Sequence, residues 1–157
     1  MTLSIPARSK LGICGRTGSG KSSFVLCLLQ MLDLSDGRII IDGLDLSRCS
    51  REVVRSVFTT IPQDSVLFEG SIRFNLDPEK SANDGHLEDA LRKVQLWDIV
   101  NQDLGLSASM DSVHLSHGQR QLFVLARAML SKARILILDE AVSRYVCHIF
   151  LQNVIRD

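Results

Sequence analysis

The stretch GRTGSGKS, residues 15–22, is the feature that most constrains the fold of this chain. Its glycines and lysine follow the spacing G-x-x-x-x-G-K-[S/T]. It lies between a short apolar run, KLGIC at 10–14, and a mostly apolar run, KSSFVLCLLQML at 21–32. A glycine-rich backbone in this setting curls so that successive amide groups point inward, beside a helix N-terminus of positive potential. The sequence therefore predicts a strand, a phosphate-binding loop and a helix.

The side chains of this loop predict how phosphates and a metal ion are held. Lys21 supplies a mobile positive charge to the outer phosphates, and the hydroxyl of Ser22 can coordinate Mg²⁺. The residues expected to bind the phosphates form the loop and the first helical turn: Gly15, Arg16, Thr17, Gly18, Ser19, Gly20, Lys21, Ser22 and Ser23. The alternative is a glycine-rich turn with a surface lysine, which the flanking strand and helix patterns disfavour.

A second motif is the apolar run RILIL, residues 134–138, which ends in two adjacent carboxylates. Proteins with this phosphate loop place an apolar strand beside it and end the strand with an acid that faces the magnesium ion. Asp139 fits that role. Glu140 would point to the other side of the terminal phosphate, where a carboxylate can orient and partly deprotonate an attacking water. The alternative is that the two acids only cap a strand in solvent. It does not explain why the apolar run ends at two adjacent carboxylates.

The rest of the pattern predicts further strands and helices. GRIIIDG at 37–43 is a β-branched run closed by Asp-Gly, and FTTIP at 58–62 is a short strand. SREVVRSV at 50–57 and GQRQLFVLARAMLS at 118–131 are expected to be helices. The run at 134–138 is expected to be a central strand of a parallel sheet, because it is apolar on both faces.

The segment 71–115 has a different character and predicts a helical subdomain. Its apolar residues recur near helical spacing, which is typical of a helix with a buried face. The residues expected to pack in this helical core are Leu87, Leu91, Val94, Trp97 and Val100.

Composition restricts the partners. Eighteen basic residues balance eighteen acidic ones, so the chain lacks the electrostatic character of a nucleic-acid binder, and we expect no nucleic-acid partner. The longest nearly apolar run, at 24–32, is too short to span a bilayer. The four cysteines show no C-x-x-C spacing and follow no secretory signal, which favours free thiols in a reducing compartment such as the cytosol. Because the basic and acidic residues balance, an anionic ligand must be held by a local site rather than by the overall charge of the chain.

A third motif, LSHGQRQL at 115–122, resembles the signature of ATP-binding cassette (ABC) proteins, and it precedes the paired carboxylates as in that family. Ser116, Gly118 and Gln119 lie at a predicted helix N-terminus, where a hydroxyl, backbone amides and the helix dipole make a second phosphate-binding surface. The resemblance implies ATP and Mg²⁺ as ligands. It also implies a second cassette as partner, with two ATP molecules sandwiched head to tail between the two cassettes.

The segment 61–78 narrows the resemblance. Gln63 is similar to the family's Q-loop glutamine, which touches the magnesium shell and links it to the helical subdomain that contacts the membrane domains. RFNLDP at 73–78 and VQLWDIV at 94–100 resemble the second cassette of the multidrug-resistance-associated exporters, subfamily C.

The resemblance extends from about Thr2 to Glu140 and implies an α/β fold. We expect a P-loop NTPase with a RecA-like parallel-sheet core, residues 1 to about 70 and about 116–157. An ABC helical subdomain, about 71–115, is inserted between these two parts of the core.

The same resemblance implies the function. The chain is expected to be part of a nucleotide-binding domain at the cytoplasmic face of a membrane, where Mg-dependent ATP hydrolysis powers export through attached transmembrane domains. Glu140, Gln63 and Lys21 are expected to act in hydrolysis, and Ser22, Gln63 and Asp139 to hold the magnesium ion. With no transmembrane segment of its own, the chain would be cytosolic if expressed alone.

The family pattern ends after Glu140. Family cassettes continue with a D-loop that contains an Asp and, later, a switch histidine, whereas AVSRYVCHIF at 141–150 offers no such Asp. The adenine-stacking aromatic of the family lies upstream of the first strand. We therefore expect an incomplete cassette, truncated at both ends, and interpret 142–150 as the product of a damaged or wrongly joined reading frame.

Two alternatives stay open. One is a truncated fragment that binds nucleotide without hydrolysing it. The other is a soluble cassette ATPase that serves no transporter, which the stretches at 73–78 and 94–100 disfavour.

Overall fold

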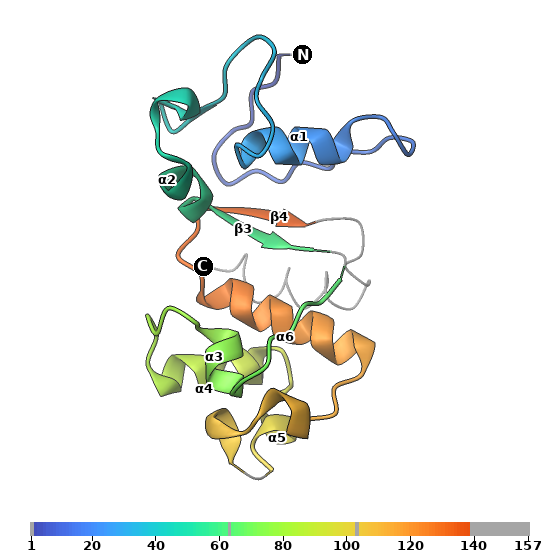
Figure 1. The fold of residues 1–157 in the computed structure, drawn as a ribbon, viewed down its shortest axis with the longest axis vertical. Helices are drawn as coiled ribbons and strands as arrows, with labels where there is room; N and C mark the ends of the chain where they lie inside the picture. Colours follow the sequence, from blue (N-terminus) through green and yellow to red (C-terminus); the bar gives the residue numbers. More distant parts are fainter. Residues whose placement is uncertain (1, 63, 103, 139–157) are drawn as a thin grey trace. The chain divides into compact units, whose positions relative to one another are not determined.

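The computed structural model describes residues 2–62, 64–102 and 104–138. The chain divides into two compact units, Met1–Arg55 and Ser56–Asp157 (Figure 1). Three of the predicted site residues, Gln63, Asp139 and Glu140, lie outside the described residues, and so does the segment 142–150.

The first unit begins with irregular chain. Residues 10–14 form no strand, and the side chains of Leu11 and Ile13 in this segment are exposed. The predicted strand is therefore wrong. An apolar run becomes a strand only where a neighbouring backbone accepts and donates its hydrogen bonds. The only strand pair within the described residues of this unit is a short hairpin farther along the chain.

Helix α1, Lys21–Leu28, confirms the helix predicted after the loop but ends before the apolar run does. Gln30 adopts a left-handed φ of 52° just beyond the helix. The N–H of Met31 then donates to the Leu26 carbonyl at 2.8 Å, as in a Schellman motif. The side-chain amide of Gln30 donates to the Leu46 carbonyl at 2.5 Å. These bonds end α1 and tie its C-terminus to the chain that follows.

The run at 37–43 leads into a β-hairpin. Strands β1, Ile40–Ile41, and β2, Leu44–Asp45, pair antiparallel. Asp42 and Gly43 form the turn with φ values of 50° and 81°. Two consecutive positive φ values are what a two-residue hairpin turn of type I′ requires, which is why Asp-Gly is favoured there. The predicted closure by Asp-Gly is confirmed.

Two short helices follow the hairpin, and the second ends one residue past the first unit. The 3₁₀ helix η1 spans Leu46–Arg48, and Asp45 caps it by accepting the N–H of Ser47 at 3.0 Å. Helix α2, Arg51–Ser56, confirms the helix predicted at 50–57.

The second unit contains two parallel strands. β3, Phe58–Ile61, pairs with β4, Ile135–Leu138, residue by residue along both strands. Both strand predictions are confirmed. The prediction that β4 is central and buried on both faces is not met within the described residues, where its one partner is β3 and Leu138 is 40% exposed. An apolar run is buried on both faces only where other elements cover both, and the sequence of the run does not specify those elements.

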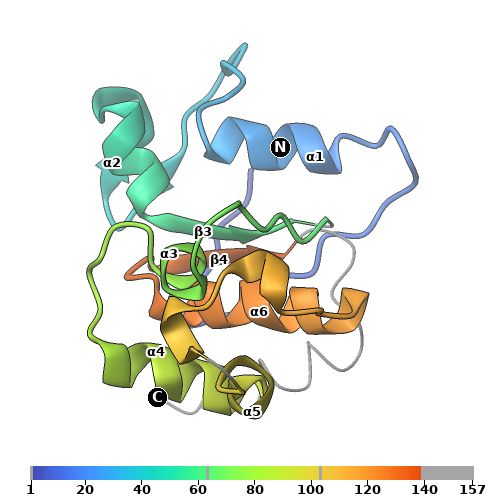
Figure 2. The same ribbon diagram turned by 60° about the horizontal axis from the view of Figure 1, so that its bottom comes forward.

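Between and beside these strands the unit is helical, as predicted for 71–115 and 118–131. Helix α6 lies between the β3–β4 pair and helices α3 and α4 in Figure 1, and Figure 2 shows it between the strand pair and α4. The helices in chain order are α3 Ile72–Leu76, α4 Asp84–Lys93, α5 Trp97–Val100, η2 Gly105–Ser107, η3 Met110–Ser112 and α6 His117–Leu130.

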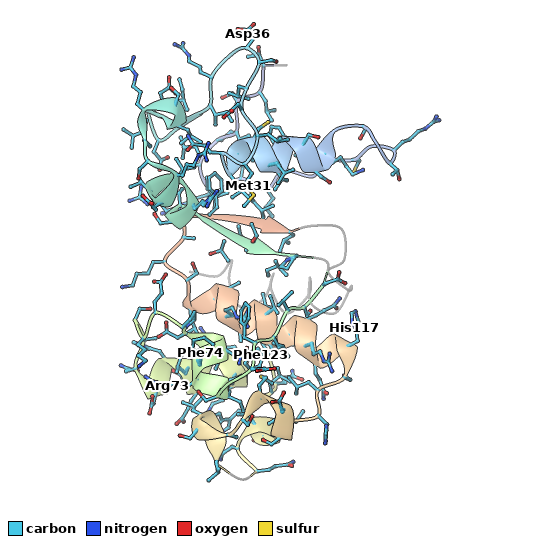
Figure 3. The ribbon with its side chains drawn as sticks, viewed as in Figure 1. Met31, Asp36, Arg73, Phe74, His117 and Phe123 are labelled. Carbon is cyan, nitrogen blue, oxygen red and sulfur yellow. The ribbon has the colours of Figure 1, made fainter. Side chains whose placement is uncertain are left out.

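The hydrophobic core of this unit lies where α6 meets α3 and α4. Phe123 of α6 is fully buried there (Figure 3). Trp97 is partly buried and packs against the same cluster. The other apolar residues predicted to pack here are fully buried, which confirms the helical periodicity: Leu87, Leu91, Val94 and Val100. Within the described parts of the chain, no helix has both the length and the apolar character needed to cross a membrane.

Candidate functional site

The phosphate-binding loop lies in the first unit and leads directly into α1. Gly18 and Gly20 have φ values of 80° and 94°, a left-handed conformation that residues with a Cβ rarely adopt. A Cβ added at either glycine would meet no atom within 4 Å. Glycine is therefore required at these two positions by backbone conformation rather than by lack of space.

Gly15 is required for a different reason. A Cβ at this position would clash with the hydroxyl of Ser19, which folds back toward the start of the loop. The N–H of Ser19 donates to the carbonyl of Arg16 at 3.1 Å and closes a tight turn. The loop is thus held in a compact curve by its own backbone.

Lys21 lies across this curve. Its Nζ donates to the carbonyl of Gly15 at 2.8 Å and to the carbonyl of Arg16 at 3.3 Å. The positive charge is therefore held beside the loop backbone, where it can reach an anion bound by the loop.

Helix α1 presents its N-terminus to the same place. The first amides of an α-helix have no acceptor within the helix, and the N-cap residue is Gly20, which brings no side chain to accept from them. The hydroxyls of Ser22 and Ser23 are exposed in this first turn. A loop of left-handed glycines, a lysine amine and an uncapped helix N-terminus together suit a phosphate group.

The signature residues lie in the second unit at the start of α6, so their predicted place at a helix N-terminus is confirmed. Ser116 is the N-cap, and its Oγ accepts the N–H of Gln119 at 3.3 Å. In return the Gln119 Oε1 accepts the N–H of Ser116 at 2.8 Å. This reciprocal capping box explains why the helix begins here.

The same turn can still present polar groups to a ligand. A serine hydroxyl that accepts a hydrogen bond retains its own proton to donate, and Ser116 is exposed. A Cβ on Gly118 would meet nothing within 4 Å, so the chain itself does not demand glycine there. Whether these residues bind phosphate stays a prediction, as do the roles of Gln63, Asp139 and Glu140, which lie outside the described residues.

A polar cluster in the second unit was missed by the sequence analysis. Asn75 is buried, and Arg127 donates three hydrogen bonds to the backbone and side chain around it. The available signals were an asparagine at a buried position of an apolar turn and an arginine within the apolar stretch of α6. Neither signal shows that Asn75 and Arg127, which are 52 residues apart, contact each other.

Comparison with known proteins places these motifs in a family. The family model described as "ABC transporter" matches residues 1–143. An ABC-type transporter of Gibberella zeae is 54% identical over 144 residues, which cover 91% of this chain and 10% of that protein. ATP-binding cassette sub-family C member 8 of Homo sapiens is 49% identical over 138 residues, covering 84% of this chain and 8% of that protein.

A third relative, ABC multidrug transporter B of Aspergillus fumigatus, is 41% identical over 159 residues, covering 100% of this chain and 11% of that protein. The chain thus spans about a tenth of the length of these curated relatives. Membership of the family implies a P-loop NTPase fold, and the mixed helices and strands of the structure agree with it. The chain belongs to the ABC transporter family, with a subfamily C member among its relatives.

Proposed function

We propose that the chain binds ATP with Mg²⁺ and hydrolyses it as part of the nucleotide-binding domain of an ABC transporter, so that hydrolysis powers transmembrane export. The observation that carries this proposal is the loop at 15–22. Its left-handed glycines, Gly18 and Gly20, shape the backbone, and Lys21 lies across it. Family membership over residues 1–143 supports the same reading.

The binding step uses the loop and the first turn of α1. Backbone amides of the loop hold the phosphates, and Lys21 moves its amine from the Gly15 carbonyl toward the outer phosphate oxygens. The hydroxyl of Ser22, with Gln63 and Asp139, would hold Mg²⁺, because oxygen donors are the ligands that this ion prefers. An ion held by these residues would supply positive charge that offsets the charge of the phosphates.

The hydrolytic step is assigned to residues at the end of β4 and after β3. Glu140 orients a water molecule and accepts its proton in part as it attacks the terminal phosphate. Gln63 is assigned to the same step through its predicted contact with the magnesium shell. Electrostatic and orienting groups of this kind typically contribute about a hundredfold or more each to the rate.

The signature turn of this chain is assigned to contact with a partner cassette. Ser116, Gly118 and Gln119 would close on nucleotide held by that partner, in a head-to-tail pair with two ATP molecules between the cassettes. Transmembrane domains, which the transporter relatives suggest, would be moved by closure and reopening. The proposed architecture is a RecA-like core, about 1–70 and about 116–157, with a helical subdomain at about 71–115.

The first test is nucleotide binding by the full chain. A fluorescent ATP analogue with Mg²⁺ is titrated against the wild type, Lys21→Ala and the control Lys132→Ala, a substitution of an exposed lysine between α6 and β4. We expect Lys21→Ala to weaken binding at least about tenfold, because it removes a charge-assisted contact worth more than about 1.4 kcal/mol. Equal affinity of the wild type and Lys21→Ala would contradict the assigned site.

The second test separates binding from turnover. Glu140→Gln is expected to leave nucleotide affinity within about twofold while the hydrolysis rate falls by about a hundredfold or more, because the general base is lost and the phosphate contacts are kept. Phosphate release is measured with Lys21→Ala as background. Loss of binding in Glu140→Gln would refute the role of Glu140. Binding without any turnover in the wild type would favour a nucleotide-binding fragment that does not hydrolyse ATP.

A further inference from the structure

Gln30, just beyond the end of α1, has a strained backbone conformation. Its φ of 52° is a left-handed value that glycine adopts readily and that residues with a Cβ rarely adopt. Its N–H donates to the carbonyl of Cys27 at 3.1 Å, and the N–H of Met31 donates to the carbonyl of Leu26 at 2.8 Å. Strained backbone of this kind persists only where the surrounding structure holds it, and it is common at functional sites.

The side chain of Gln30 makes a contact that glycine could not make. Its Nε2 donates to the backbone carbonyl of Leu46 at 2.5 Å. Leu46 is itself firmly held. Its side chain is 5% exposed, its N–H donates to the carbonyl of Ile39 at 2.9 Å, and its carbonyl also accepts the N–H of Cys49 at 3.1 Å. One side chain therefore ties the end of α1 to a fixed point 16 residues farther along the chain.

This contact is important because packing restrains α1 only weakly. All eight residues of the helix lie within the described residues, and none of their side chains is buried. A helix moves as a stiff body because its backbone hydrogen bonds are internal, and α1 is only about 12 Å long. A displacement of its C-terminus therefore also displaces its N-terminus.

The N-terminus of α1 contains the charge of the phosphate site. Lys21 is the first residue of the helix, and its Nζ donates to the carbonyl of Gly15 in the loop at 2.8 Å. In loops of this type the backbone amides cradle the inner phosphates, whereas the lysine reaches the β- and γ-phosphates. ATP has a γ-phosphate and ADP does not. A change in the direction of α1 should therefore alter the affinity for ATP more than the affinity for ADP.

We propose that Gln30 is a positioning residue of the nucleotide site: its bond to the Leu46 carbonyl fixes the direction of α1 and so places Lys21 at the terminal phosphate. This inference rests on the proposed function. Gln30 lies at the opposite end of α1 from the loop and acts through Lys21. Its loss therefore lowers the preference for ATP over ADP.

The direct test measures two affinities of the full chain. Fluorescent analogues of ATP and ADP, each with Mg²⁺, are titrated against the wild type, Gln30→Gly and Gln30→Lys. Glycine suits a left-handed backbone, so Gln30→Gly removes the bond to Leu46 without straining the helix end. We expect it to weaken ATP binding about fivefold and ADP binding less than about twofold, as for one lost hydrogen bond. Gln30→Lys, whose amine can donate to the same carbonyl, should recover most of the loss.

The ratio of the two affinities separates positioning from a purely structural role. Partial unfolding lowers the apparent affinity for both nucleotides by the same factor, because it lowers the fraction of chains that can bind. Equal weakening of ATP and ADP binding in Gln30→Gly, or unchanged ATP binding, would overturn the proposal.

Gln95 provides a matched control. It follows α4 in the same way, with a φ of 60° and an N–H that donates to the carbonyl of Arg92 at 3.0 Å. The N–H of Leu96 then donates to the carbonyl of Leu91 at 2.9 Å. Gln95→Gly therefore makes the same substitution in the same backbone conformation, but in the second unit. We expect it to leave the preference for ATP unchanged. An equal loss of preference in Gln95→Gly would overturn the role of Gln30.

A double-mutant cycle tests whether Gln30 acts through Lys21. Gln30→Gly is combined with Lys21→Ala, and the affinity for the ATP analogue is measured for all four forms. We expect Gln30→Gly to add little in the Lys21→Ala background, because the amine that it displaces is already absent. Additive losses would overturn the proposal.

The two proposals fail in distinguishable ways. If Lys21→Ala binds the ATP analogue as the wild type does, the proposed function fails. If Lys21→Ala weakens binding as expected and Gln30→Gly leaves the ratio of the two affinities unchanged, only the role of Gln30 fails.

Discussion

Asp77 ends α3 and folds its carboxylate over the loop that follows. Its Oδ2 accepts the N–H of Ala82 at 2.7 Å, and its Oδ1 accepts the hydroxyl of Ser81 at 3.2 Å. Burial acts to raise the pKa of Asp77, but these hydrogen bonds, that of the Ser81 amide and the charge of Arg73 outweigh burial and lower the pKa. The ionised carboxylate therefore stabilises the connection between α3 and α4.

This carboxylate predicts a pH-dependent stability. Asp77→Asn is expected to lower the free energy of unfolding by about 1–2 kcal/mol at pH 7, because the hydrogen bonds to a charged acceptor are lost. Since the folded pKa is depressed, the advantage of the wild type is fully present above the unfolded pKa of about 3.9 and is lost as the pH falls through the lower folded pKa.

Urea unfolding of both proteins between pH 7 and pH 3 measures the difference. Asp89→Asn, which changes an exposed carboxylate in α4, is the matched control and should alter stability little. A difference between wild type and Asp77→Asn that does not shrink on acidification would contradict the assigned contacts.

Single residues also show where prediction from sequence reaches its limit. The Asp42–Gly43 turn was predictable because positive φ values favour these residue types. The end of α1 was not, because Gln30 adopts a left-handed conformation that ordinarily favours glycine. Its side chain is held by the carbonyl of Leu46, a residue of a later element. A contact of this kind leaves no local signal in the sequence.

At the scale of elements, α6 is the helix with the clearest start signal. Ser116 and Gln119 cap it reciprocally, and Leu122 through Ala126 are buried against the rest of the unit. The capping residues, the apolar period and the length of this helix all agree, which is why it was predicted from sequence to within a residue at each end.

The cap can be tested without nucleotide. Ser116→Ala is expected to lower the free energy of unfolding by about 1 kcal/mol, because it leaves the N–H of Gln119 without its acceptor, and Ser116→Thr should restore most of the loss. Urea unfolding at pH 7 gives both values. Gly118→Ala is the internal comparison: it meets open space, so it should not destabilise the helix. If Ser116→Ala is as stable as wild type, the capping box does not contribute in solution.

Strands were harder to predict than helices for a physical reason. β3 and β4 were identified from their apolar and β-branched residues, but the same reasoning wrongly assigned a strand to residues 10–14. It also predicted full cover for β4, which the described residues do not provide. Helical hydrogen bonds are internal to a segment, whereas a strand depends on partners far away in sequence. The same distinction applies to the candidate site. The loop at 15–22 and the signature at 115–122 were predictable because each is contiguous in sequence. The Arg127–Asn75 cluster was not, because it joins residues from different elements.

At the scale of the whole molecule, buried apolar residues are distributed unevenly. Within the described residues of Met1–Arg55, Leu46 and Val54 are the buried apolar side chains, and α1 has none. The second unit contains the continuous core around Phe123. Since burial of apolar surface is the main stabilising contribution, the two units should differ in local stability.

Hydrogen exchange should show this difference directly. Amides in α1 are expected to exchange at least about a hundredfold faster than those in the centre of α6, because few buried contacts oppose local opening of α1. Saturating Mg-ATP should slow exchange in α1 of the wild type, because a ligand that binds only the folded form stabilises it. Lys21→Ala serves as the control and should not respond at the same ATP concentration. Equal exchange in α1 and α6 without ligand would contradict the expected difference.

The parallel pairing of β3 with β4 also determines an order of events during folding. Residues 62–134 separate the two strands, and all of α3 to α6 lies in this interval. During synthesis β3 emerges long before β4, its one partner among the described strands, so the edge that pairs with β4 stays unpaired until β4 is made. Closing so long a loop costs conformational entropy, and this cost falls if the intervening helices have already packed together. The helical core would then act as a template that brings the strands together, so mutations in that core should slow the formation of the sheet as well as weaken the helices.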